Sequence, residues 1–195
     1  MKIAIIKYNA GNTQSVIYAL ERLGIEPTLT NDFDEIQRAD KVIFPGVGEA
    51  STTMKHLQEL GLDKLIPNLK QPVLGVCLGM QLMCEYSEEG NTKGLGIFKA
   101  PVKKFKAQAG EKVPHMGWNS LATSESNWLI HGILDMHMYF VHSYFVPVVA
   151  ETVATCDYIE PFSAALEKDN FYATQFHPEK SSKQGEQIIK NFIEL

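Results

Sequence analysis

Apolar and polar positions alternate in blocks along the first half of the chain. The short apolar runs, typical of buried strands, are residues 2–7, 28–30, 41–44 and 72–74, the second of them weak. Apolar positions from Val16 to Leu23 share one helical face, and Gly24 is well placed to end that helix. Further helices are predicted over residues 51–60 and 62–69 and directly after Cys77. This rhythm predicts an α/β fold with an open, mostly parallel sheet flanked by helices.

The second half of the chain changes character and favours additional antiparallel strands. The strand candidates are residues 96–102, 138–146, 151–156, 163–168 and 171–176. Asp169-Asn170 is typical of a hairpin turn between the last two. Residues 183–195 have apolar positions at helical spacing and predict a terminal helix, whereas residues 103–112 and 124–128 are polar and are interpreted as surface loops.

Length and composition narrow the class of protein. With 195 residues, 45% of them hydrophobic, we expect one globular domain over residues 1–195. The net charge of -5 gives no electrostatic reason to expect nucleic acid or an anionic membrane as a partner, and we expect neither. The apolar run at the N-terminus is too brief for a signal sequence, and no stretch approaches membrane-spanning length.

The three cysteines indicate a reducing compartment. They are an odd number without paired metal-ligand spacing, so we expect neither a disulfide framework nor a metal site. These features predict a cytoplasmic location. Small molecules or proteins are the expected partners.

The most informative residue is Cys77, in the segment GVCLGMQ at residues 75–81. It follows an apolar run and precedes a helix-like stretch, with glycine two positions to either side. A sharp strand-to-helix elbow of this kind exposes a nucleophile above a sheet. The first amides of the following helix lack intrahelical partners, so they stabilise both a thiolate and a developing oxyanion.

A second segment, QFHPE at residues 175–179, supplies a base at the end of another strand. If the two strands are neighbours, His177 can take the thiol proton and deliver it to a leaving amine. Glu179 would then fix the imidazole tautomer and stabilise the imidazolium. The predicted catalytic set is Cys77, His177 and Glu179.

A third strand end, PGVG at residues 45–48, is the candidate for an oxyanion hole. Its glycines permit close approach of the backbone to a ligand. One donor would be the Leu78 amide and the second would come from the loop formed by Gly46, Val47 and Gly48. The loss of one such donor typically costs ~3 kcal/mol of activation free energy.

Each assignment has a simpler alternative. A cysteine after a buried strand is often an inert core residue, and Glu179 alone could be a solvated carboxylate. Cys84, two helical turns after Cys77, is interpreted as buried packing on the same helix. Structural or surface roles are expected for the other histidines, which are His56, His115, His131, His137 and His142.

Together the segments at residues 75–81 and 175–179 resemble the class I glutamine amidotransferases. Finer segments are similar to one branch of that family, the glutaminase subunits of imidazole glycerol phosphate synthase. These segments are PGVG at 45–48, PHMGWN at 114–119, FVHSY at 140–144, KDNFY at 168–172 and HPEKS at 177–181. The resemblance spans essentially the whole chain and leaves no residues for a fused synthase domain, so it implies a separate partner.

The resemblance implies a glutaminase reaction. Cys77 attacks the glutamine carboxamide and forms a glutamyl thioester, ammonia leaves, and water releases glutamate, with His177 handling both proton transfers. It also implies that Gln81, the backbone around Gly48 and the Ser143-Tyr144 segment hold the glutamine amino and carboxylate groups. The reaction implies no cofactor and no metal.

The implied partner is a cyclase subunit of barrel fold, bound as a heterodimer. It would receive ammonia through the protein interior and join it to an open-chain ribulosyl aminoimidazole carboxamide phosphate. The products are imidazole glycerol phosphate and an aminoimidazole carboxamide ribotide, in histidine biosynthesis. Met116 and Trp118 are residue types enriched at interface cores, with core packing as the alternative. The candidate interface residues are Asn12, Pro114, His115, Met116, Trp118 and Lys180.

Two further hypotheses concern regulation and class. The Val47 peptide could rest with its carbonyl directed inward and flip only when the partner holds its own ligand, which predicts low activity for the lone chain. The alternatives are a glutaminase subunit for pyridoxal phosphate or anthranilate synthesis, and a non-catalytic thiol sensor on the same fold. The segment at 114–119 favours histidine biosynthesis.

Overall fold

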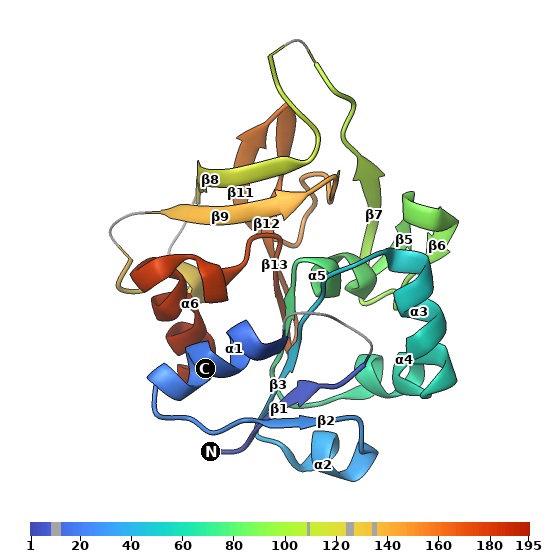
Figure 1. The fold of residues 1–195 in the computed structure, drawn as a ribbon, viewed down its shortest axis with the longest axis vertical. Helices are drawn as coiled ribbons and strands as arrows, with labels where there is room; N and C mark the ends of the chain where they lie inside the picture. Colours follow the sequence, from blue (N-terminus) through green and yellow to red (C-terminus); the bar gives the residue numbers. More distant parts are fainter. Residues whose placement is uncertain (9–12, 109, 124–126, 134–135) are drawn as a thin grey trace.

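A seven-stranded sheet forms the centre of the computed structural model, which describes residues 1–8, 13–108, 110–123, 127–133 and 136–195 (Figure 1). Its strand order is β11-β12-β13-β4-β3-β1-β2. The strands are β1 (Ile3–Ile6), β2 (Thr28–Thr30), β3 (Lys41–Phe44), β4 (Val73–Val76), β11 (Thr152–Tyr158), β12 (Glu160–Lys168) and β13 (Phe171–Thr174). Strands β2, β1, β3, β4 and β13 are parallel, while β12 and β11 continue the sheet antiparallel. The predicted fold class is confirmed.

Helices cover both faces of this sheet because alternate residues of its strands are apolar on each side (Figure 1). On one face, α1 (Thr13–Arg22) and α6 (Ser182–Glu194) pack on side chains such as Ile5 and Ile43. On the other, α3 (Ala50–Glu59), α4 (Leu62–Leu65) and α5 (Leu78–Met83) pack on Ile6 and Phe44. The short helix α2 (Phe33–Arg38) follows β2 at the sheet edge.

Two smaller sheets stand at the carboxyl ends of the parallel strands. One has the order β10-β7-β5-β6, formed by β5 (Cys84–Ser87), β6 (Thr92–Lys93), β7 (Phe98–Lys104) and β10 (Tyr144–Phe145). The other is an antiparallel pair, β8 (His115–Ser120) with β9 (His137–His142). The 3-10 turns are η1 (Ile66–Asn68), η2 (Glu89–Asn91), η3 (Trp128–Ile130) and η4 (Pro178–Lys180). A cluster of phenylalanines, including Phe105, Phe140 and Phe162, fills the space between these elements.

Several sequence predictions need correction. Cys84 does not continue the helix after Cys77: α5 ends at Met83, and Cys84 begins β5, although it is buried as expected. The single strand predicted over residues 138–146 is two strands separated at Ser143. The loop predicted at 103–112 begins later, because β7 extends through Lys104. The hairpin turn is confirmed, since Asp169 has a φ of 53° between the antiparallel β12 and β13.

Among the described residues, no helix is long and apolar enough to cross a membrane.

Candidate active site

Cys77 lies on a strained turn between β4 and α5. Its φ of 53° and ψ of −108° are unusual for a residue with a side chain, and strain of this kind concentrates at functional sites. The turn requires glycine nearby. A Cβ on Gly79 would lie 2.1 Å from the Phe44 carbonyl oxygen, and one on Gly46 would lie 2.2 Å from the Gly79 nitrogen. The structure therefore has the elbow that the sequence predicts.

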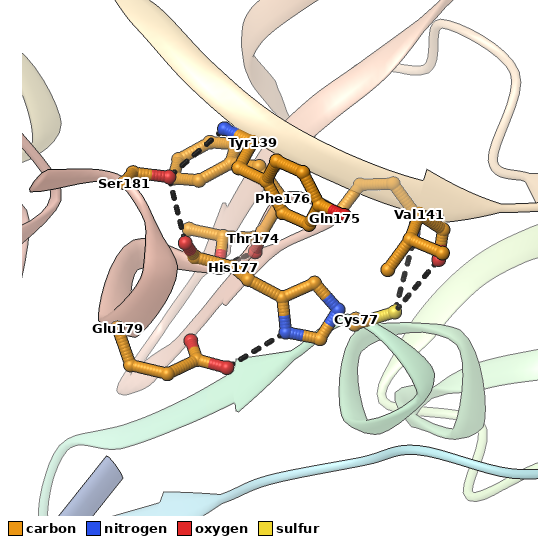
Figure 2. A network of polar contacts seen from close by, with 9 residues as sticks. All are labelled: Cys77, Tyr139, Val141, Thr174, Gln175, Phe176, His177, Glu179 and Ser181. Atoms are coloured by element: carbon orange, nitrogen blue, oxygen red, sulfur yellow. Dashed lines mark hydrogen bonds and ion pairs between the residues drawn. The ribbon is translucent and has the colours of Figure 1, made fainter. Parts of the chain in front are cut away.

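The fold brings Cys77 and His177 together because their strands are adjacent. β4 and β13 are parallel neighbours, with Val76 opposite Thr174, and the Cys77 amide donates a hydrogen bond of 2.7 Å to the Thr174 carbonyl. The chain beyond β13 then carries His177 above the elbow (Figure 2). Its own amide donates a hydrogen bond of 2.9 Å to the Tyr139 carbonyl on β9.

His177 and Glu179 form a buried pair. His177 Nδ1 lies 2.8 Å from Glu179 Oε1, and the two side chains are only 1% and 3% exposed. The other ring nitrogen, Nε2, is buried, faces Cys77 (Figure 2) and has no hydrogen-bond partner by distance and angle in the described part of the chain. The geometry matches a nucleophile, a base and a group that orients the base.

The electrostatics of the pair favour a protonated imidazole. Burial alone lowers the pKa of His177, but interaction with Cys77 and then with Glu179 outweighs burial and raises this pKa to about 10. An imidazolium beside a thiol favours the thiolate, which is the nucleophilic form.

Two further groups contact the Cys77 sulfur. The thiol lies 3.9 Å from the Val141 carbonyl of β9, and the Gln175 side chain donates an Nε2–H to Sγ over 3.7 Å (Figure 2). Gln175 is fully buried. The sequence segment at 175–179 includes this residue, but no spacing rule distinguishes it from a core residue.

A hydrogen bond within the protein already engages the predicted oxyanion loop. The Leu78 amide, which is the first expected donor, donates to the Gly46 carbonyl over 3.4 Å. The carbonyl of the peptide that joins Gly46 to Val47 is thus directed at the donor. Gly48 follows with a φ of +115°, and no atom lies within 4 Å of the position that a Cβ would take there.

A cavity of about 320 Å³ opens above the elbow, large enough for a free amino acid. It is lined by Val47, Gly48, Cys77, Leu78, Gln81, Glu89, Pro114, Val141, His142, Ser143, Tyr144 and His177. All the residues predicted for the oxyanion hole or for glutamine binding line it, except Gly46. Gln81 is fixed in the wall, because its Nε2 donates to the Tyr144 carbonyl over 2.9 Å and to Gln175 Oε1 over 3.0 Å.

Glu89 is a cavity residue that sequence reasoning missed. It lies in η2, and its Oε2 accepts a hydrogen bond of 2.9 Å from the Ala50 amide at the start of α3. Burial raises the pKa of this carboxyl, opposed by that hydrogen bond. Its segment follows β5, and neither spacing nor flanking residues single it out.

The candidate interface residues differ in exposure. Met116 and Trp118 are 64% and 53% exposed, and their side chains point outward. His115, between Pro114 and Met116, is 3% exposed and points inward, so its placement on a partner-facing surface needs correction. Pro114 and Lys180 are exposed, whereas Asn12 lies outside the described residues.

His115 and His142 form a buried pair at the cavity wall, which His142 lines. His115 Nδ1 lies 3.0 Å from His142 Nε2, and His142 Nδ1 lies 2.7 Å from the Tyr144 carbonyl. Burial lowers the pKa of His115 to about 4 and that of His142 to about 3. Both are therefore neutral at physiological pH, in keeping with the structural roles expected from the sequence.

The chain has relatives both in sequence and in structure. The sequence model of the family described as glutamine amidotransferase class-I matches residues 4–195. The chain is 62% identical to the imidazole glycerol phosphate synthase subunit HisH of Bacteroides fragilis, over 100% of both chains. It is 46% identical to the protein of that name from Yersinia pseudotuberculosis, again over 100% of both. A crystal structure of a glutamine amidotransferase matches the fold with a TM-score of 0.75 at 19% identity, covering 98% of this chain and 97% of the other.

Proposed function

Since the chain belongs to the class-I glutamine amidotransferases, we propose that it is the glutaminase subunit of imidazole glycerol phosphate synthase, acting in histidine biosynthesis. The observation that carries this proposal is the full-length similarity to subunits of that name, up to 62% identity. The arrangement of Cys77, His177 and Glu179 supports the glutaminase chemistry of this proposal. We further propose that residues 1–195 form one domain and act in the cytoplasm, where a reducing medium keeps the three free thiols reduced.

In the first half of the reaction, Cys77 is acylated. Its sulfur attacks the carboxamide carbon of glutamine and forms a glutamyl thioester as the C–N bond breaks. His177 holds a proton at Nε2, the nitrogen that faces the sulfur, and delivers it to the leaving nitrogen, so that ammonia departs. Glu179 keeps Nδ1 protonated and stabilises the imidazolium.

In the second half, water cleaves the thioester. The neutral imidazole of His177 takes a proton from the attacking water, glutamate leaves, and the proton returns to the pair formed by His177 and Cys77. His177 can serve as the base in both steps, because its Nε2 faces the sulfur that carries the acyl group.

Glutamine would be held by polar groups of the cavity wall. Both Nε2 hydrogens of Gln81 are used within the protein, so Gln81 offers its Oε1 to the cavity as an acceptor. Together with the Glu89 carboxylate, this acceptor suits the substrate ammonium group. The Ser143-Tyr144 segment and the Gly48 backbone are proposed to bind the remaining polar groups.

The oxyanion hole is proposed to be closed in the lone chain. The Leu78 amide is engaged by the Gly46 carbonyl, and the Val47 amide necessarily points the opposite way because the peptide is planar and trans. A flip of this one peptide would free the first donor and supply the second. We propose that the liganded cyclase favours the flipped state.

The partner is proposed to be the barrel-fold cyclase, which forms a heterodimer with this chain. The outward face of β8, with Met116 and Trp118, supplies an exposed apolar surface near the cavity mouth, where Pro114 contributes to the lining. Ammonia would be protonated in bulk water and lose its nucleophilicity, so a dry passage to the cyclase has a chemical purpose. Glutaminases of other pathways and a thiol sensor are less well supported, since the relatives share the full length and the triad is complete.

The test is glutamate release from glutamine by the purified chain, alone and with a cyclase carrying its ribulosyl ligand. We expect strong stimulation by the liganded cyclase and complete loss in Cys77→Ala. Cys156→Ala is the matched control, because it removes another buried thiol, in β11. Hydrolysis that depends on Cys77 but is not stimulated by the cyclase would point to a different acceptor enzyme.

A further inference from the structure

Two buried carboxamides connect the cavity wall to the nucleophile. Gln81, in α5, and Gln175, after β13, are 5% and 0% exposed. Gln81 Nε2 donates to Gln175 Oε1 over 3.0 Å, and Gln175 Nε2 donates to Cys77 Sγ over 3.7 Å. The mechanism proposed above assigns no role to Gln175.

These hydrogen bonds form a series from Tyr144 through Gln81 and Gln175 to Cys77. The Tyr144 carbonyl determines the direction of each one. The Tyr144 carbonyl can only accept, so the group that Gln81 presents to it must be its NH₂. The same NH₂ faces Gln175, which must therefore present its oxygen to Gln81. Gln175 consequently presents its own NH₂ to the sulfur, because the opposite orientation would set two donors against each other.

We infer that Gln175 is a positioning residue that holds the Cys77 sulfur with a fixed N–H donor and, through its oxygen, fixes the orientation of Gln81. The inference rests on the proposed glutaminase function and adds a residue to its site. Gln175 touches the nucleophile in the resting protein and reaches the substrate only through Gln81.

The sulfur needs such a donor when it ionises. The Val141 carbonyl, 3.9 Å from Sγ, suits the thiol, which can donate to it, but it presents negative charge to a thiolate. The Gln175 N–H favours the thiolate, since hydrogen bonds to charged acceptors are stronger than those to neutral ones. Gln175 and His177 therefore act on the same atom, one with a fixed dipole and the other with a proton.

The test is the rate of Cys77 alkylation by iodoacetamide as a function of pH, followed by mass spectrometry in the full chain. Gln175→Met keeps the length of the side chain and removes both hydrogen bonds. We expect the midpoint of the pH profile to rise by about one pH unit, and alkylation at pH values below that midpoint to fall by about tenfold. Steady-state kinetics with the cyclase should show a raised KM as well as a lowered kcat, because Gln81 also loses its partner.

Two controls make the result decisive. Asn191→Leu removes another buried carboxamide, in α6, which donates to Leu129 and His131 carbonyls, and it should leave the alkylation profile unchanged. Gln175→Glu keeps an acceptor for Gln81 but sets a carboxyl oxygen opposite the sulfur, so we expect slow alkylation even if the Met variant does not fold. A wild-type profile in either folded Gln175 variant would overturn the inference. Alkylation needs neither glutamine nor cyclase, so failure of the proposed function would appear separately, as absent glutamate release by the unmodified chain.

Discussion

The backbone amide of Leu78 donates a hydrogen bond of 3.4 Å to the carbonyl oxygen of Gly46. This contact occupies the first donor of the predicted oxyanion hole, directly beside the nucleophile. The triad is otherwise assembled, since His177 and Glu179 are paired at 2.8 Å. The nucleophile is therefore in place, whereas the oxyanion hole is blocked. A reaction that needs only the nucleophile should proceed in the lone chain, and one that also needs the oxyanion hole should be slow.

The lone chain should be alkylated at Cys77 while it hydrolyses glutamine slowly. Alkylation by iodoacetamide requires a thiolate but no oxyanion stabilisation, whereas amide hydrolysis requires both. Loss of one oxyanion donor slows acyl transfer by about 10²- to 10³-fold, and we expect stimulation by the liganded cyclase of that order. Parallel measurement of both rates, with Cys77→Ala as the blank, checks this. Rapid glutamate release by the lone chain would contradict the closed hole and leave the triad assignment intact.

The protonation of His177 should depend on Cys77. The pKa of His177 is about 10 because interaction with Cys77 and Glu179 exceeds the effect of burial. Cys77→Ala removes the larger of the two raising influences, so the pKa of His177 should fall. NMR titration of the histidine ring nitrogens in both proteins measures it. An unchanged titration would show that Glu179 alone holds the proton on the ring.

The raised pKa of His177 should make the stability of the protein depend on pH. A histidine whose pKa is raised in the folded state stabilises that state fully below its unfolded pKa of about 6.5, and this stabilisation is lost as the pH rises through about 10. We expect the free energy of unfolding of the native chain to decline across this window more steeply than that of His177→Gln. Urea titrations at pH 7 and pH 9.5 provide the comparison.

The strands that carry the site could be predicted from the sequence because their local patterns are strong. The run at 41–44 is β3 to the residue, and Cys77 and His177 follow β4 and β13, which the structure makes neighbours. Hydrophobic runs identify such buried strands without knowledge of tertiary contacts. The elbow could also be predicted, because its two flanking glycines are required: a Cβ at Gly79 would lie 2.1 Å from the Phe44 carbonyl oxygen, and one at Gly75 would lie 2.7 Å from Met83 Sδ.

Strand β8 and helix α2 could not be predicted from the sequence, because their apolar residues do not follow the spacing of a half-buried strand or helix. β8 was not predicted because Met116 and Trp118 are apolar on its outward face and mask the alternation. Helix α2 has one buried residue, Ile36, and is identified mainly by its cap, in which Asp32 accepts from the Glu35 amide. Glu89 and Gln175 reach the site through tertiary packing alone, so no local signal marks them.

Gly79→Ala should be far more damaging than Gly48→Ala. A Cβ at Gly79 would lie 2.1 Å from the Phe44 carbonyl oxygen, and neither backbone can move without disturbing the elbow. We expect a loss of about 3 kcal/mol or more in the free energy of unfolding, or no folded protein. At Gly48 nothing lies within 4 Å of the added Cβ, so only the strain of its φ of +115° counts, on the order of 1 to 3 kcal/mol. Thermal and urea unfolding of both variants would show whether the order is reversed.

His142 should make the protein less stable in mild acid. The pKa of an unfolded histidine is about 6.5, whereas burial lowers the pKa of His142 to about 3. Between these values the unfolded state binds more protons, so stability is fully present above about pH 6.5 and falls as the pH drops, by up to about 1.4 kcal/mol per pH unit. His142→Gln should flatten the difference in unfolding free energy between pH 7 and pH 5. His131→Gln, at an exposed position, is the control and should keep the wild-type slope.

Trp118→Ala and Met116→Ala should weaken binding of the cyclase without unfolding the chain. Both side chains point outward from β8, and Trp118 is steadied by an edge contact with Tyr139 at 6.1 Å between ring centroids. Large aromatic side chains at an interface centre commonly contribute about 2 kcal/mol or more, which corresponds to roughly 30-fold in the dissociation constant. Tyr86→Ala is the matched control, because Tyr86 is also an exposed aromatic residue but lies in β5, on the opposite side of the view in Figure 1. Calorimetric titration with the cyclase should separate the two positions, and equal affinities for Trp118→Ala and Tyr86→Ala would place the interface away from β8.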